Sequence, residues 1–160
     1  MNDTEKIVAD IIKLDEANKR VIIAIDGRSG SGKTFFAESL PSKLPNARVV
    51  HLDQFDMYKG DPSIQMVIDE VIKPFKSSKD NQILILDGIF SLSSKFDQYT
   101  DYKIWIEYPA DLGYKRGLER DRALNGIDNS DKWINYWLPK EEEYVTNENP
   151  QKKANHIINI

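Results

Sequence analysis

Residues 21 to 34 decide the fold of this chain, and they read VIIAIDGRSGSGKT, from Val21 to Thr34. The first five are an unbroken run of β-branched and small apolar residues, which is typical of a buried parallel strand. Gly27 to Thr34 then match the pattern G-x-x-x-x-G-K-[ST] at every fixed position, and the residues that follow favour a helix start. The stretch therefore predicts a strand, a phosphate-binding loop and a helix, in that order.

The chemistry of such a loop predicts a nucleoside triphosphate as its ligand. Glycines let the backbone fold closely around phosphates, so that N–H groups and the helix N-terminus face the negative oxygens. We expect Lys33 to neutralise the β- and γ-phosphates and Thr34 to offer its hydroxyl to Mg²⁺. The residues predicted to bind the nucleotide are Gly27, Arg28, Ser29, Gly30, Ser31, Gly32, Lys33 and Thr34.

Composition limits the remaining possibilities. A chain of 160 residues is close to the size of one domain, so we expect a single domain over residues 1–160. It has no cysteine, which excludes disulfides and thiolate metal sites and fits a reducing cytoplasm. The first residues lack the pattern of a secretion signal, and no apolar run approaches membrane-spanning length, so a soluble, cytoplasmic protein is expected.

The charge balance predicts the kind of partner. Acidic residues number 26 against 22 basic ones, a net charge of −4, which disfavours nucleic acid and anionic membranes as partners. A small-molecule substrate is the better expectation, and the oligomeric state stays open.

Apolar patterns along the chain predict alternating strands and helices. The strand segments are residues 19–25, 47–52, 82–86, 102–107 and 156–160. The helical segments are 1–18, capped near Asp3 or Thr4, then 33–43, 64–75, 110–125 and 132–147, with Pro139 interrupting or kinking the last. Residues 59–63 and 76–81 read as polar loops. This alternation predicts an α/β fold whose parallel sheet is covered on both faces.

Ligands of such sheets bind at the carboxyl ends of the strands, where the phosphate loop, Asp53, Asp87 and Glu107 would emerge together. Asp87 ends an apolar run and could serve the Mg²⁺ of a triphosphate, or it could simply start a turn before Gly88. Asp53 leads into residues 54–60, which mix carboxylates with aromatic rings. Such a loop could orient a hydroxyl and stack a ring, or it could be a solvated turn.

Other polar and aromatic residues are more ambiguous. Arg116 and Arg120 lie four residues apart, so they share a helix face and could bind phosphates, or they could pair with neighbouring carboxylates. The spacing of Trp133, Tyr136 and Trp137 favours core packing over base stacking. His51 and His156 fall in apolar strand patterns, which favours structural roles.

Several motifs, taken in order, resemble the uridine kinase family of P-loop kinases, which is phosphoribulokinase-like. The segments that carry the resemblance are residues 25–34, Leu52-Asp53-Gln54-Phe55, Asp87-Gly88-Ile89-Phe90, Arg116 with Arg120-Asp121, and the tail over residues 138–158. The resemblance covers nearly the whole chain from Val21. Its first motif is highly specific, and the others gain weight from their order.

The resemblance implies a P-loop NTPase fold, three-layer α/β/α, with a five-stranded parallel sheet and a helical lid over residues 110–126. ATP and Mg²⁺ would be the cofactors, and a nucleoside hydroxyl would receive the γ-phosphate. Asp53 matches the residue that takes the hydroxyl proton and touches Mg²⁺, and Asp87 matches the metal-side carboxylate. Lys33, Arg116 and Arg120 would act in catalysis. Phe55, Asp56 and Tyr58, with Asp53, would contact the acceptor.

The chain also departs from the family pattern. Asp56 replaces an aromatic residue, residues 59–81 are short for a nucleoside pocket, and Asn155 replaces the tail aspartate of many relatives. Gly113 and Gly117 stand where relatives often carry further arginines. The acceptor could thus be another alcohol, such as pantothenate or nicotinamide riboside, or the chain could be a catalytically weak ATP-binding regulator. A GTPase would normally carry an Asn-Lys-x-Asp motif, and this sequence does not contain one.

Overall fold

The strands of the computed structural model form a parallel sheet in the order β2-β3-β1-β4-β5, within the described residues 1–17, 20–80 and 82–160. They are β1 (Val21–Gly27), β2 (Ala47–His51), β3 (Ile83–Asp87), β4 (Tyr102–Glu107) and β5 (His156–Asn159). Every residue of β1 and β3 is buried, as the apolar runs predict for central strands. The predicted first strand began at Lys19, which lies outside the described residues, and β1 runs two residues past Ile25.

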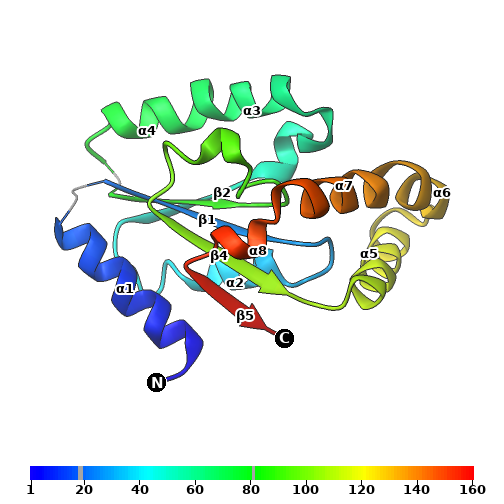
Figure 1. Ribbon diagram of the computed structural model, residues 1–160, viewed down its shortest axis with the longest axis horizontal. Helices are drawn as coiled ribbons and strands as arrows, with labels where there is room; N and C mark the ends of the chain where they lie inside the picture. The colour runs from blue at the N-terminus through cyan, green and yellow to red at the C-terminus, as the bar shows by residue number, and fades with distance from the viewer. Residues whose placement is uncertain (18–19, 81) are drawn as a thin grey trace.

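Helices cover both faces of this sheet, and Figure 1 shows the two layers. On one face α1 (Asp3–Ala17) and α2 (Lys33–Ser39) pack against alternate strand residues such as Ile23. On the other, α3 (Asp61–Val67), η3 (Ile68–Ile72) and α4 (Lys73–Ser77) pack against Ile22 and its neighbours. The predicted α/β fold with a covered parallel sheet is therefore confirmed.

Four further helices lie toward the carboxyl ends of the strands (Figure 1). They are α5 (Ala110–Asn125), α6 (Ser130–Lys132), η5 (Trp133–Trp137) and α7 (Leu138–Glu148), whereas α8 (Pro150–Lys153) lies beside β4. Helix α5 occupies the predicted lid region and ends at Gly126, whose φ of +63° suits glycine. The site region is thus built from segments that follow β1, β2, β3 and β4.

Two prolines shape these helices in the same way. The predicted helices 64–75 and 132–147 begin earlier, at Asp61 and Ser130, and each contains a π-helical segment two residues before a proline, Pro74 or Pro139. A proline lacks the N–H donor and crowds the preceding turn, and a wider turn relieves that crowding. Pro139 therefore widens the helix without interrupting it.

Several local predictions were wrong. Residues 52–60 are η1 (Leu52–Phe55) and η2 (Met57–Lys59), not an open loop, and α3 starts inside the predicted loop 59–63. The predicted helix 33–43 ends as an α-helix at Ser39. Asn2 and Glu5 cap α1 by exchanging hydrogen bonds of 2.9 Å, so the cap precedes the residues we expected. Helix α4 takes up part of the predicted loop 76–81, whose Asn81 lies outside the described residues.

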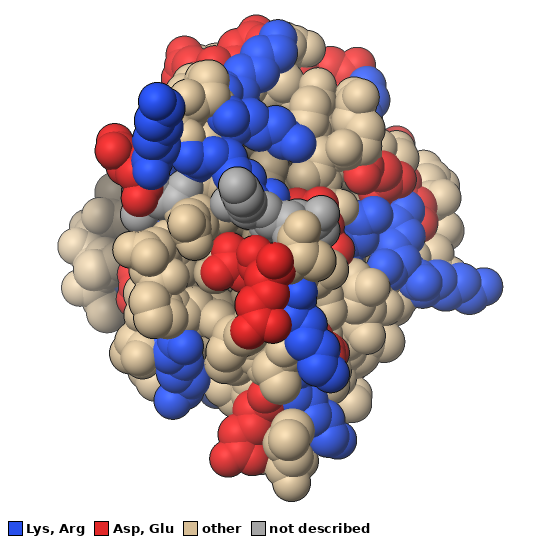
Figure 2. All heavy atoms as spheres, turned by 90° about the vertical axis from the view of Figure 1, so that its left-hand side faces the viewer, with Lys and Arg blue, Asp and Glu red and all other residues tan. Residues whose placement is uncertain are grey.

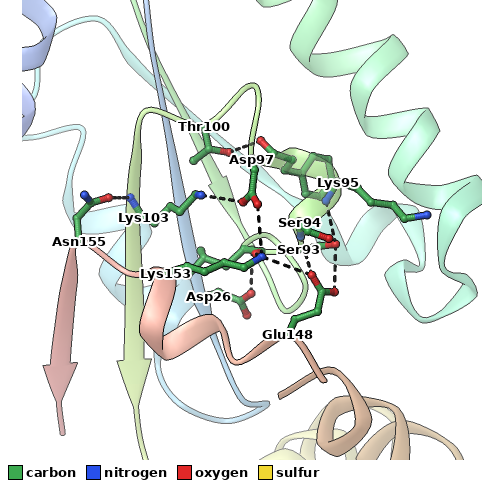
Figure 3. Close-up of polar contacts among 12 residues, drawn as sticks. Asp26, Ser93, Ser94, Lys95, Asp97, Thr100, Lys103, Glu148, Lys153 and Asn155 are labelled. Carbon is green, nitrogen blue, oxygen red and sulfur yellow. Dashed lines mark hydrogen bonds and ion pairs between the residues drawn. The ribbon is translucent and has the colours of Figure 1, made fainter. Parts of the chain in front are cut away.

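A polar network holds the C-terminal helices to the segment after β3 (Figure 3). Lys153 Nζ donates to the carbonyl oxygen of Leu92 at 3.1 Å, and it lies 3.6 Å from an Asp97 oxygen and 3.5 Å from a Glu148 oxygen. Glu148 in turn accepts from the backbone N–H of Ser94 at 2.7 Å. Asn155 Oδ1 accepts from the N–H of Lys103 at 2.8 Å and so aligns β5 with β4.

The end of the molecule opposite the site carries both kinds of charge. Figure 2 shows Lys and Arg side chains interleaved with Asp and Glu over this face. Neighbouring charges of opposite sign largely cancel each other's field there. Among the described residues, the helices are too short or too polar to cross a membrane.

Candidate active site

The phosphate loop joins β1 to α2 at the carboxyl edge of the sheet. Gly30 and Gly32 have φ angles of +77° and +91°, the left-handed region that favours glycine. A Cβ atom on Gly27 would lie 2.7 Å from the carbonyl oxygen of Ile106, so this position too requires glycine. The motif glycines therefore allow both the turn and its close packing on β4.

A cavity of about 290 Å³ opens beside this loop. Its lining residues are Ser29, Gly30, Lys33, Thr34, Asp53, Asp56, Met57, Tyr58, Asp87, Gly88, Ile89, Arg120, Asp121, Trp133 and Trp137. The structure thus brings together the phosphate loop, both predicted carboxylates and one predicted arginine. Glu107, the last residue of β4, also reaches this edge, where it accepts a 2.9 Å hydrogen bond from Trp105 Nε1.

Asp87 and Thr34 form a pair suited to Mg²⁺. Thr34 Oγ1 donates to Asp87 Oδ2 at 2.9 Å, while the buried Oδ1 atom of Asp87 has no hydrogen-bond partner among the described residues. In that part of the chain, no group of three or more His, Asp or Glu side chains could hold a metal alone. One carboxylate and one hydroxyl suit Mg²⁺, which takes its other ligands from water and phosphate oxygens.

His51 belongs to this site, although its sequence pattern favoured a structural role. Its Nδ1 lies 2.7 Å from Asp87 Oδ2 and its Nε2 lies 3.1 Å from a Glu38 oxygen. Burial lowers the pKa of His51, but Asp87 and Glu38 outweigh burial and raise it above the ordinary value. The residue was missed because its contact with Asp87 follows from the pairing of β2 with β3.

The acceptor loop, residues 52–60, contributes three predicted residues to the cavity. Asp53 is exposed in its lining, Asp56 sits at a left-handed φ of +50°, and Tyr58 is partly buried. Phe55, the fourth, packs against the apolar core under α3. Asp53, Asp56 and Tyr58 are therefore placed where they could meet an acceptor, whereas Phe55 anchors the loop.

The two predicted arginines have different surroundings. Arg120 lines the cavity, and its side chain is 58% exposed. Arg116 donates to the carbonyl oxygen of Gly30 at 3.1 Å and stacks over the ring of Tyr108 at 4.4 Å. Arg120 therefore faces the cavity while its Nε lies 3.8 Å from an oxygen of Asp121, the neighbouring carboxylate, whereas Arg116 braces α5 against the phosphate loop.

Trp133 and Trp137 both line the cavity, which spacing alone did not indicate. Trp133 is 3% exposed, as core packing predicts, and it fits against Gly117 so closely that a Cβ there would lie 2.5 Å from the ring. Its Nε1 donates to Asp121 Oδ2 at 2.8 Å. The aromatic face of this helix therefore forms both core and cavity wall.

A buried carboxylate lies directly beneath the phosphate loop. Asp26 accepts from the N–H groups of Gly27 and Leu92 at 2.7 and 3.0 Å and from the Tyr144 hydroxyl at 2.7 Å. Burial raises the pKa of Asp26 to about 6, although these hydrogen bonds partly offset the effect. Burial, with the nearby charge of Asp26, also raises the pKa of Tyr144, so its hydroxyl remains a donor.

Comparisons with known proteins agree with this geometry. The family model described as the phosphoribulokinase/uridine kinase family matches residues 59–159. A protein named uridine kinase from Bacillus mycoides strain KBAB4 is 24% identical over 88% of this chain and 85% of its own length.

Solved structures show the same fold. A structure described as a possible uridine kinase from Bacillus stearothermophilus has a TM-score of 0.67 at 18% identity, covering 98% of this chain and 100% of that one. Shikimate kinase from Acinetobacter baumannii, in complex with shikimate, has a TM-score of 0.54 at 15% identity, covering 88% and 84%. The chain therefore belongs to the phosphoribulokinase/uridine kinase family and is a small-molecule kinase with a P-loop fold.

Proposed function

We propose that this protein transfers the γ-phosphate of Mg·ATP to a hydroxyl of a small molecule, and that this acceptor is a nucleoside. The observation that carries the proposal is the shared cavity, which Lys33, Asp87 and Asp53 all line. The similarity to a uridine kinase from Bacillus mycoides supports the choice of a nucleoside.

Each side chain has a separate task in this proposal. The loop N–H groups and Lys33 would hold the triphosphate, with Arg120 added from α5. Mg²⁺, when bound, would neutralise charge on the phosphate oxygens, and Thr34 and Asp87 are the residues that would hold it. Asp53 would accept the proton of the attacking hydroxyl. Catalysis would come mainly from alignment and electrostatics.

A non-nucleoside alcohol is the second candidate for the acceptor. Asp53, Asp56 and Asp121 line the cavity together, and such carboxylates can accept hydrogen bonds from any polyol or amine. One fold neighbour was solved with shikimate, which is not a nucleoside. Pantothenate and nicotinamide riboside therefore belong in the same assay as nucleosides.

The test is ADP release from Mg·ATP against a panel of nucleosides, nicotinamide riboside, pantothenate and simple sugars. Asp53→Asn should lower kcat by about 10²- to 10⁴-fold while ATP still binds. Asp69→Asn, an exposed carboxylate on η3, is the control and should retain full turnover. Unchanged turnover in Asp53→Asn would overturn the role given to Asp53. If ATP binds but no compound of the panel stimulates ADP release, the result would favour a regulatory ATP-binding protein.

A further inference from the structure

Three consecutive residues of α7 connect the phosphate loop to the acceptor loop. Lys140 Nζ donates to the carbonyl oxygen of Tyr58 at 2.9 Å. Glu141 Oε1 accepts from the N–H of Ser29 at 3.1 Å and from the Tyr58 hydroxyl at 3.0 Å. Glu142 pairs with Arg28 at 2.5 Å. One helical turn therefore reaches both loops.

Glu141 is the centre of this arrangement because it alone bonds to both loops through one oxygen. The Ser29 hydroxyl also donates to Glu141 Oε1, so three donors converge on that atom. The residue is 1% exposed, and a carboxylate so far from water requires such donors. Its position is thus dictated by the two loops that it joins.

The ring of Tyr58 is also held by aromatic packing. The Tyr58 ring meets Phe90 edge to face at 5.2 Å, and Phe90 meets Tyr144 at 4.9 Å. Phe90 has a φ of +74°, a strained angle for a residue other than glycine. Tyr144 lies three residues after Glu141, on the same helix face, and bonds to Asp26 below the phosphate loop. Helix α7 thereby fixes Tyr58 from two directions.

We propose that Glu141 is a positioning residue that sets the distance between the bound γ-phosphate and the acceptor hydroxyl. Ser29 and Tyr58 both line the cavity, the first from the phosphate loop and the second from the acceptor loop. Phosphoryl transfer depends on alignment, and a misplacement near 1 Å can cost about 10²-fold in rate. This inference rests on the proposed function, since it assigns Glu141 to the same site.

The first test measures hydrogen exchange and needs no turnover. In Glu141→Ala with Mg·ATP, amides of residues 28–32 and 52–60 should exchange about tenfold faster or more, because both segments lose their common acceptor. Glu141→Gln keeps one acceptor oxygen and should give a smaller increase. Glu143→Ala, an exposed residue of the same helix, should leave both segments unchanged. Faster exchange in only one segment, or equally throughout the sheet, would overturn the proposal.

The second test uses the acceptor found in the panel. Glu141→Ala should lower kcat by about 10- to 100-fold while the KM for ATP changes by less than about threefold. More ADP should be released per acceptor phosphorylated, because a loosened acceptor loop admits water. In the double variant Glu141→Ala with Tyr58→Phe, the fold-loss in kcat should be smaller than the product of the fold-losses of the two single variants.

Two results would contradict the positioning role of Glu141, and a third would contradict the proposed function alone. If the loss in kcat of the double variant equals the product of the losses of the two single variants, Glu141 and Tyr58 act independently, which would contradict the proposed positioning role. Tighter ATP binding in Glu141→Gln would also contradict it, because it would show that the charge of Glu141 opposes nucleotide binding. A wild-type protein that transfers no phosphate would contradict the proposed function, whereas the exchange comparison would still decide whether Glu141 couples the two loops.

Discussion

Gly113 in α5 rests directly on Gly30 in the phosphate loop. A Cβ atom on Gly30 would lie 2.2 Å from the carbonyl oxygen of Gly113, and one on Gly113 would lie 2.3 Å from the carbonyl oxygen of Ser29. No atom can be placed at such distances without moving one backbone away from the other. Gly113 therefore brings α5 into backbone contact with the phosphate loop.

Gly113→Ala should separate α5 from the phosphate loop. Alanine in a helix ordinarily stabilises a protein by about 0.5–1 kcal/mol relative to glycine. Here the clash should reverse the sign, with a loss of about 1–3 kcal/mol in the free energy of unfolding and weaker Mg·ATP binding. Urea unfolding and calorimetric titration measure both. Glu119→Ala, on an exposed position of α5, is the control, and a stabilised Gly113→Ala protein would refute the contact.

Asp87→Asn should weaken the use of Mg²⁺ more than the binding of nucleotide. The variant loses the charge that faces Thr34 and His51 and leaves an amide where the unpartnered Oδ1 now stands. We expect the Mg²⁺ concentration for half-maximal turnover to rise about 10- to 100-fold. Metal titrations at saturating ATP measure this. Asp80→Asn, at an exposed position, is the control and should leave the Mg²⁺ requirement unchanged. An unchanged Mg²⁺ requirement in Asp87→Asn would show that Asp87 does not belong to the metal site.

Lys33→Ala should weaken nucleotide binding and phosphoryl transfer together. Lys33 lines the cavity, and its Nζ donates a long hydrogen bond of 3.4 Å to the carbonyl oxygen of Arg28, so it can turn to phosphates. Its loss should raise the Kd for Mg·ATP by about tenfold or more. Lys115→Ala, on an exposed position of α5, is the matched control in equilibrium binding. Full affinity and activity in Lys33→Ala would contradict the phosphate-loop assignment.

Asp26 should make stability depend on pH in the unusual direction for a carboxylate. Its folded pKa of about 6 exceeds the ordinary value of 3.8, so the folded protein retains this proton while the unfolded chain has lost it. The contribution is fully present below pH 3.8 and is lost as pH rises through about 6. The loss amounts to about 3 kcal/mol.

Urea unfolding of wild type and Asp26→Asn between pH 4.5 and 7.5 measures this contribution. The free energy of unfolding of wild type should fall relative to that of the variant as pH rises. Asp69→Asn is the exposed control, because a hydrogen bond from Lys73 lowers the pKa of Asp69 below its ordinary value of 3.8, so its contribution to the free energy of unfolding should stay constant over this pH range. A difference between wild type and Asp26→Asn that does not change with pH would show that Asp26 titrates normally.

Much of the fold was predictable because its signals are local. The apolar run at Val21 and the motif up to Thr34 specify strand, loop and helix without reference to other segments. Helix boundaries near Pro74 and Pro139 were less predictable, since a π-helical turn can absorb a proline that would otherwise end the helix. Trp133 was correctly expected in the core, but its position beside the cavity depends on Gly117.

The sequence by itself determined the strand segments, the phosphate loop and the placement of Asp53 and Asp87 near the carboxyl ends of the strands, because apolar runs and glycine-rich turns are local signals. Only the tertiary structure decided the contacts that join distant segments. His51 reaches Asp87 through strand pairing, and Glu141 reaches Ser29 from a helix 112 positions away. Such contacts leave no periodic pattern along the chain, because they depend on how elements pack and not on how neighbouring residues alternate.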